Sequence, residues 1–219
     1  MKTKTYLSLC AAACLACAAL SVHAECYVTA GIGKTTFPRI AWDQVTTDNI
    51  NVDEGTAWGL GGGCFESQYF GMQIEYVDYG RYMDYGHFAF EGSDGTLDYS
   101  QTYIANGEGK AHGVAVMFLA RYPMGAIVPY AGAGIVRMTE RYRISYPPRA
   151  DGTPAGVYED KTYITHPIKY TVGVEMGSQQ KHSGDISFRA EYFTLNTKAN
   201  GDDSKSGAHG VMVWLVSTF

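Results

Sequence analysis

The sequence predicts an all-β protein, an eight-stranded antiparallel up-and-down transmembrane β-barrel, over residues 25–219. Three observations predict it. Apolar and polar residues alternate with period two almost throughout this region, and 26 glycines with many β-branched and aromatic residues accompany the alternation. The connections between the alternating segments are short and long in turn, which is typical of a barrel with one elaborate end. No segment in this region predicts a helix.

The first 24 residues have the pattern of a secretory signal peptide. Lys2 and Lys4 precede an apolar run from Tyr6 to Leu20, and Val22-His23-Ala24 is a small-x-small cleavage site. We therefore expect a signal peptide at 1–24 and a barrel domain at 25–219. A membrane anchor fits less well because the run is shorter than the ~20 residues of a spanning helix. Lipidation at Cys17 also fits less well, since the preceding residues match a lipidation box poorly.

The charge of the chain is acidic, with 17 Lys and Arg against 22 Asp and Glu and a formal net charge of −5. Loss of Lys2 and Lys4 with the signal peptide would take it to −7. An acidic exported chain is a poor partner for nucleic acid, whose phosphates require a basic face. We expect no nucleic acid, no cofactor and no bound metal.

Eight segments carry the alternation, and we expect each to form one strand of about the ~9–11 residues that a tilted strand needs to cross a bilayer. Short connections follow the second, fourth and sixth, and long ones cover residues 38–55, 82–109, 143–164 and 198–206. The predicted strands are Cys26–Phe37, Thr56–Ser67, Gly71–Arg81, Lys110–Pro123, Val128–Tyr142, Thr165–Ser178, Ile186–Thr197 and Gly207–Phe219.

The alternation also assigns the two faces of each strand. In the fourth segment Val114, Val116 and Phe118 share an apolar side, while Arg121 lies on the other. A soluble lipocalin-like barrel would turn such an apolar side inward, and period two alone does not exclude it. Sparse charges of both signs fit a neutralised polar interior inside a lipid-facing belt. The predicted interior charges are Glu75, Arg121, Lys169, Glu175, Arg189 and Glu191.

The stretch TAGIGKTTF, residues 29–37, contains Gly33-Lys34-Thr35, the end of a phosphate-binding loop motif. The first glycine of that motif would stand at position 28, which is Val28. We interpret the stretch instead as the first membrane strand. Thr29, Gly31 and Gly33 then line the interior, where small residues leave room for larger neighbours, and Lys34 approaches the outer rim.

The final strand favours the membrane interpretation. The chain stops on VMVWLVSTF, with Phe219 last and Val211, Val213 and Leu215 on one face. This ending resembles the C-terminal signature of bacterial outer-membrane barrels, which implies that Phe219 is the signal read by the barrel assembly machinery. Ser217 departs from the aromatic or apolar residue usual two positions before the end.

Two short phrases and an internal repeat indicate a family. PYAGAGI (129–135) and IEYVDYG (74–80), with the closing Phe219, resemble the eight-stranded outer-membrane family of the OmpA transmembrane domain and the neisserial opacity proteins. YVTAGIG (27–33) resembles YAGAGIV (130–136), and AHGVAV (111–116) resembles AHGVMV (208–213), which suggests a four-strand unit used twice. The resemblance implies an OmpA-like barrel in the bacterial outer membrane, in contact with its lipid and lipopolysaccharide.

Two kinds of side chain are candidates for chemistry. Cys26 and Cys64 fall near the periplasmic end of the first hairpin, on the lipid-facing side, and an oxidising compartment permits a disulfide. Two free thiols are the alternative. His112, His166 and His209 lie at the loop-side ends of strands. Lipid A-modifying barrels carry such residues, but no matching His–Ser pair occurs on that side, so we expect no enzyme.

Any specific function is expected in the long loops. Tyr-rich, Gly-rich segments suit protein recognition, although the alternation in 82–109 also predicts that the strands simply continue there, with a turn at Ser93-Asp94-Gly95. The expected role is structural or surface interaction, adhesin- or opacity-like, with a host or cell-surface protein as partner. A narrow porin-like channel and a lipid A-modifying enzyme are the alternatives. The recognition candidates are Tyr82, Tyr85, Phe88, Phe90, Tyr99 and Tyr103.

Overall fold

The structure, a computed structural model, describes residues 24–37, 54–93, 98–146, 156–177, 184–198, 205–206 and 208–219. The predicted signal peptide therefore lies outside the described residues except for Ala24. No helix within the described ranges is long and apolar enough to cross a membrane. The strands are β1 (Glu25–Thr36), β2 (Glu54–Phe65), β3 (Phe70–Ser93), β4 (Asp98–Arg121), β5 (Ile127–Tyr146), β6 (Gly156–Thr165), β7 (Ile168–Met176), β8 (Ile186–Lys198), β9 (Lys205–Ser206) and β10 (His209–Thr218).

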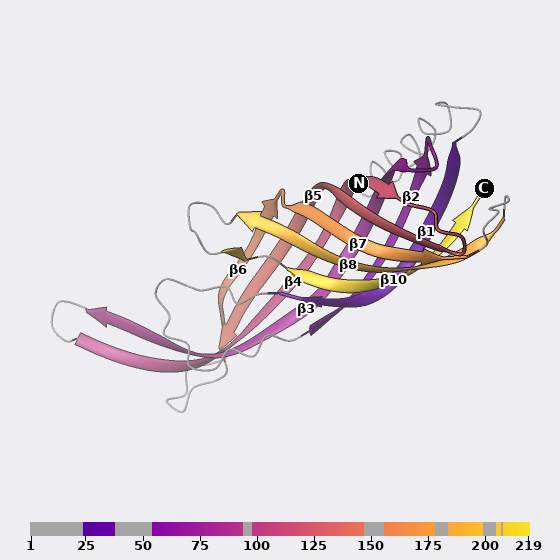
Figure 1. Ribbon diagram of the computed structural model, residues 1–219. Coiled ribbons are helices and arrows are strands. Elements are labelled where there is room, and N and C mark those ends of the chain that lie inside the picture. Colours follow the sequence, from indigo (N-terminus) through magenta and orange to yellow (C-terminus); the bar gives the residue numbers. More distant parts are fainter. Residues whose placement is uncertain are drawn as a thin grey trace, which may run out of the picture.

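Eight of these strands close into an antiparallel barrel (Figure 1). The order around the ring is β1-β2-β3-β4-β5-β7-β8-β10, and β10 pairs with both β8 and β1. β6 extends the β5 hairpin above the ring and β9 pairs only with β8. The predicted fold, an eight-stranded up-and-down barrel, is confirmed. In such a ring β1 and β5 are four strands apart and lie on opposite sides, as do β4 and β10.

The two rims of the barrel differ, as the connection lengths predict. At one, the turn rim, β1 begins and β10 ends, with Tyr27 paired to Thr218. Residues 66–69 form a tight turn there, in which the Ser67 hydroxyl accepts hydrogen bonds from two backbone amides, those of Tyr69 (3.2 Å) and Phe70 (3.0 Å). The opposite end, the hairpin rim, carries the long connections.

The hairpin rim has more strand than the predicted boundaries include. β3 and β4 remain paired as far as Ser93 and Asp98, so the expected continuation of the two strands is confirmed. Asp94 and Gly95 of the expected turn lie outside the described residues. In the segment 143–164, expected as a loop, residues 143–146 instead belong to β5 and residues 156–164 to β6, and residues 147–155 lie outside the described residues. Pro167, which lacks an N–H for the ladder, separates β6 from β7, and its carbonyl still accepts from the Val136 amide (2.9 Å).

Burial follows the predicted alternation. On β5 the side chain of Ile135 is 63% exposed, and that of its neighbour Val136 is 0% exposed. The same rule holds on β1, where Ala30, Ile32 and Lys34 point outward. The outside of the ring is therefore an apolar belt, and the lumen is filled with buried side chains of both kinds.

The lumen accommodates its largest side chain because glycines face it. Trp214 of β10 is 1% exposed. A Cβ added at Gly31 would lie 2.5 Å from Trp214 Cε3, and one added at Gly59 would lie 2.7 Å from Trp214 Cη2. Both glycines stand at positions where a side chain would enter the lumen. Gly31 belongs to the stretch that the sequence places in the first strand. Its role is to leave space for an indole ring across the strand pair.

We predict that Gly31→Val destabilises the barrel, because the new side chain would overlap Trp214 and the Val213 carbonyl. The expected cost is about 1–3 kcal/mol of the free energy of unfolding, measured as a lower urea midpoint and as less fast-migrating folded species in unboiled gel samples. Ala30→Val adds two methyl groups on the outward face of the same strand and should change neither. Equal behaviour of the two variants would contradict the inward placement of Gly31.

Candidate functional site

The centre of the lumen is a buried ion-pair network. Lys169 of β7 donates hydrogen bonds to Glu75 of β3 and to Glu191 of β8, the latter at 2.9 Å. All three side chains are almost fully buried. A single cation thus joins strands from different parts of the ring, and both carboxylates keep a positive partner away from water.

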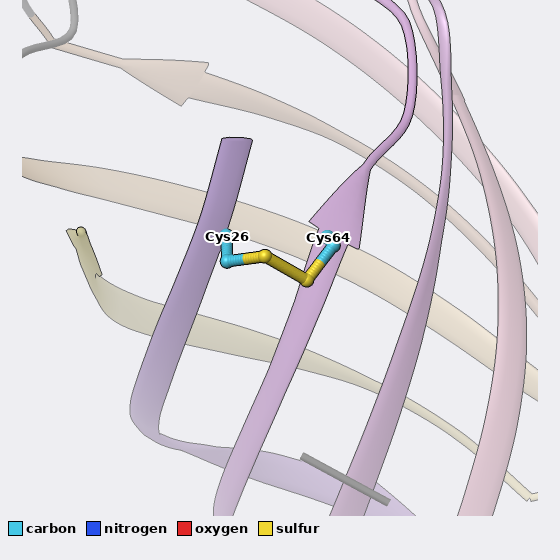
Figure 2. Close-up of a disulfide and its surroundings, with 2 residues drawn as sticks. All are labelled: Cys26 and Cys64. Carbon is cyan, nitrogen blue, oxygen red and sulfur yellow. A yellow bond between two sulfur atoms is a disulfide. The ribbon is translucent and has the colours of Figure 1, made fainter. Parts of the chain in front are cut away.

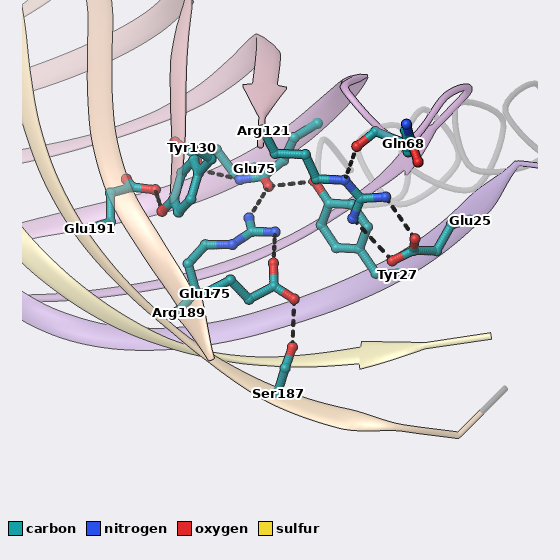
Figure 3. Close-up of polar contacts among 11 residues, drawn as sticks. Glu25, Tyr27, Gln68, Glu75, Arg121, Tyr130, Glu175, Ser187, Arg189 and Glu191 are labelled. Carbon is teal, nitrogen blue, oxygen red and sulfur yellow. Dashed lines mark hydrogen bonds and ion pairs between the residues drawn. The ribbon is translucent and has the colours of Figure 1, made fainter. Parts of the chain in front are cut away.

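A second cluster surrounds Arg189 of β8. Its guanidinium donates to Glu175 Oε2 at 3.0 Å and to Gln73 Oε1 at 2.9 Å. The same group stands between two rings, with its Cζ 5.0 Å from the centroid of Tyr27 and 4.8 Å from that of Tyr130. Figure 3 shows Arg189 reaching Glu175, which in turn accepts from Ser187 Oγ at 2.7 Å. Cation–π contacts and charge-assisted hydrogen bonds together hold this arginine in one position.

The internal repeat of the sequence places equivalent residues in this network. Aligning YVTAGIG with YAGAGIV equates Tyr27 with Tyr130, the two rings on either side of Arg189. Aligning QIEY (73–76) with RAEY (189–192) equates Glu75 with Glu191, the two carboxylates on Lys169. The core is thus approximately two-fold.

The two-fold relation also extends to the outside of the barrel, but it does not hold for the buried cations, since the counterpart of Arg189 is Gln73. The equivalent tyrosines Tyr76 and Tyr192 contact the equivalent histidines His112 and His209, with ring centroids 6.2 and 6.3 Å apart. The counterpart of Lys169 in β2, counted from the pairs Leu60–Tyr76 and Val172–Tyr192, is Ala57. One cation therefore serves both halves.

Arg121 is buried at the turn rim rather than at the centre. The interior glutamates were expected to neutralise it. Its guanidinium instead pairs with Glu25 at 2.7 and 3.2 Å, and its Nε donates to the Gln68 carbonyl at 3.0 Å (Figure 3). The expected partner is wrong. Arg121 ends β4 and Glu25 begins β1, so both lie at the turn rim, away from the glutamates at the centre. Its Cζ also stacks 3.6 Å from the Phe65 ring centroid. The side chains of Arg121 and Glu25 thus link the start of β1 to the end of β4 at the turn rim.

Cys26 and Cys64 form a disulfide in the structure, with their Cα atoms 4.0 Å apart (Figure 2). They are direct register partners on β1 and β2, near the turn rim. The bond closes a 38-residue separation, for which chain entropy gives a stabilisation of roughly 4 kcal/mol. It holds the register of the first strand, whose other edge must close the ring against β10.

The histidines are not brought together. His112 is on β4 and His209 on β10, on opposite sides of the ring, and His166 lies between β6 and β7. Within the described part of the chain, no group of three His, Cys, Asp or Glu side chains could hold a metal ion. Their position above the apolar belt is that of interfacial residues, and no described nucleophile pairs with them.

The aromatic candidates all lie on the β3–β4 hairpin beyond the ring. Tyr82, Tyr85, Phe88 and Phe90 are on β3, and Tyr99 and Tyr103 are on β4; Phe88 and Tyr103 are register partners. Phe219 is exposed at the turn rim, and its amide donates to the Cys26 carbonyl at 3.0 Å. Its role in assembly stays a prediction.

A closed ring with an apolar outside and an ionic lumen defines a small transmembrane β-barrel. Residues 7–215 match the outer membrane protein beta-barrel domain family, and the chain belongs to this family. The protein is therefore a barrel of the bacterial outer membrane, as the resemblance implied, with its turn rim toward the periplasm and its hairpin rim outside the cell. No curated protein matches the chain closely enough to count as a relative.

Solved structures with a similar fold include the following two proteins. One is Ail, the attachment invasion locus protein of Yersinia pestis, in complex with the heparin analogue sucrose octasulfate; it is 12% identical, with a TM-score of 0.50 over 90% of this chain and 100% of that one. The other is neisserial surface protein A, 12% identical, with a TM-score of 0.53 over 90% of this chain and 99% of that one. At this identity the likeness shows the fold alone.

We predict that Lys169→Met strongly destabilises the barrel, because it leaves Glu75 and Glu191 buried without a counter-ion. The expected loss is about 3–5 kcal/mol of the free energy of unfolding, read from urea unfolding in detergent or lipid. Lys34→Met removes an exposed lysine on β1 together with its surface interaction, and should cost less than about 1 kcal/mol. A Lys169→Met barrel as stable as the Lys34→Met barrel would show that the network does not hold the lumen.

Proposed function

We propose that the protein is a surface-interaction barrel whose β3–β4 hairpin binds a protein outside the cell, while the ring serves as its anchor. The observation that carries the proposal is the length of this hairpin. Its ladder continues for twelve residues along β3 beyond Arg81, as far as Ser93, or about 40 Å of extended strand. Figure 1 shows the paired β3 and β4 projecting far past the ring.

The composition of the hairpin indicates the chemistry of its partner. Residues 82–107 contain no Lys or Arg, whereas Asp84, Glu91, Asp94 and Asp98 are acidic. The Tyr and Phe residues among them are of the type that offers large contact area at low entropic cost. The complex of Ail contains a sulfated ligand, but an acidic hairpin repels a polyanion. A protein with a basic patch is the better partner.

The lumen supports an anchoring role over a channel role. Eight strands leave room for little more than side chains, and here Lys169, Arg189 and Trp214 occupy that room in paired or packed positions. The Arg121–Glu25 pair covers the turn rim. The proposal also contains no catalytic step, since the three histidines lie at separate places on the ring.

The proposal predicts that removing the hairpin abolishes binding without unfolding the barrel. Because Met83 pairs with Glu108, residues 84–107 can be replaced by an Asn-Gly turn that keeps the register. The truncated protein should lose at least about tenfold of its binding to host cells or matrix protein, measured on bacteria that display equal amounts of barrel. Gel mobility of unboiled samples reports folding.

A matched control shortens the other long hairpin. Arg143 pairs with Asp160, so residues 144–159 can be replaced by the same turn, and this variant should bind like the wild type. Changing Tyr85, Phe88, Tyr99 and Tyr103 to Ser should reproduce the loss while keeping the backbone length. Unchanged binding after truncation of the β3–β4 hairpin would refute the proposal.

A further inference from the structure

One side of the barrel carries a group of exposed cations at the hairpin rim. The group, here called the cationic band, lies on the outward faces of β3, β4 and β5. Three of its side chains are 68%, 46% and 63% exposed, those of Arg81, Lys110 and Arg141 in that order. The other two, Arg137 and Arg143, are also exposed. This concentration contrasts with the net charge of −5 of the whole chain.

The strand register places three of the cations in one lateral row. Arg81 pairs with Lys110 across β3 and β4, and Lys110 pairs with Arg141 across β4 and β5. Directly opposite residues have Cβ atoms about 4.5–5.5 Å apart, and like charges at that separation destabilise a sheet. A row of three cations therefore requires anions close by.

Carboxylates of the described residues form ion pairs with all three cations of this row. Glu108 lies 3.4 Å from Arg81, Asp78 lies 3.4 Å from Lys110, and Asp160 makes two bonds of 2.7 and 3.0 Å to Arg141. The hydrogen bond from Arg141, with a smaller contribution from the charge of Arg143, lowers the pKa of Asp160, so this carboxylate stays ionised beside both arginines.

The other two members of the band form no such bond, although Glu108 and Asp160 are the register partners of Arg143 on the two neighbouring strands. Among the described residues, neither Arg137 nor Arg143 forms an ion pair with a carboxylate. Both project from the outward face of β5, Arg137 below Arg141 and Arg143 above it. The band therefore has two cations in excess, on the side of the sheet that faces the surroundings of the barrel.

The depth of Arg137 identifies those surroundings. On β5 it is the next outward residue after Ile135, which belongs to the apolar belt. Its partner on β4 is Val114, whose partner on β3 is Tyr76. Tyr76 contacts Trp58, with ring centroids 5.5 Å apart. Exposed aromatic residues of this kind lie at the level of the lipid headgroups. Arg137 is therefore at headgroup depth in the outer leaflet.

The opposite side of the ring differs. There the described outward side chains at the same rim include Thr194 on β8, His209 on β10, and Thr36 and Lys34 on β1. Lys198 ends β8 and pairs with Lys205 of β9, and the side chains of these two lysines lie outside the described part of the structure. Among the described outward side chains, the cations are thus concentrated on β3, β4 and β5. An annular layer of lipid would be bound more strongly at β3–β5 than elsewhere.

We propose that the cationic band binds the phosphate groups of the outer-leaflet glycolipid, the lipid A part of lipopolysaccharide. Arginine is suited to this ligand because its guanidinium forms paired hydrogen bonds with phosphate. The apolar belt directly below, with Val114 and Ile135, would contact the acyl chains of the same molecule. A soluble polyanion would have to enter the headgroup layer to reach Arg137, whereas a lipid phosphate is already there.

The test uses the full-length protein in nanodiscs and measures lipid retained by native mass spectrometry. Wild-type protein should bind bisphosphorylated lipid A, and should bind the dephosphorylated form at least about tenfold more weakly. Arg137→Gln should reduce binding of the phosphorylated form about fivefold, and Arg137→Gln with Arg143→Gln about twentyfold or more. Lys34→Gln, which removes one charge from the opposite side, should stay within about twofold. Gel mobility of unboiled samples confirms folding.

Three results would overturn the inference. One is equal binding by the wild type and the double variant, and another is equal binding of both forms of lipid A. The third is competition by inorganic phosphate or a sulfated polysaccharide at concentrations that match those of the lipid, which would assign the band to a soluble anion. Because the hairpin from residue 84 to 107 is not involved, its truncation should leave lipid A binding unchanged.

Discussion

The rest of the structure depends on one buried contact, the pairing of Lys169 with Glu75 and Glu191. A charge removed from water is stable only with a counter-ion and hydrogen bonds around it, so these three side chains must lie together inside a closed ring. Once they do, period two forces the neighbouring residues of β3, β7 and β8 outward, and those residues are apolar. A ring that is polar within and apolar without is stable only in a bilayer, and this connects the network to the location of the protein.

Much of the fold could be predicted from the sequence because it depends on local periodicity. The alternation assigned inward Lys169 and outward Ile168 without knowledge of any partner strand, and the uneven connections gave the order of the ring. The close approach of Gly31 to Trp214 was predictable only in kind: a small residue inside leaves room, but the residue that fills the room depends on register. The same holds for the repeat, which is visible in the sequence although the joint binding of its two glutamates to one lysine is not.

Features that depend on the strand register, or on which strand ends meet at a rim, could not be predicted. Arg121 binds Glu25 because the ends of β4 and β1 meet at one rim, and a period-two pattern carries no information about which strand ends meet. The length of the β3–β4 hairpin was predictable from its alternating aromatic residues, whereas nearly all of β6 lies in the segment 143–164, which was expected to be a long connection. The cationic row, likewise, exists only once Arg81, Lys110 and Arg141 are aligned across three strands.

Compared with a soluble barrel, this ring has its polar side chains inside and its apolar side chains outside. Two tryptophans, one on each side of the wall, test this arrangement directly. Trp58 is outward and exposed, whereas Trp214 is buried in the lumen. Variants that retain only one of these two tryptophans, with Trp42 and the other changed to Phe, can be reconstituted in bilayers with brominated acyl chains. Because Trp58 faces lipid and Trp214 faces the lumen, we predict strong quenching of Trp58 fluorescence and little quenching of Trp214 fluorescence. Stronger quenching of Trp214, or no quenching of either, would contradict it.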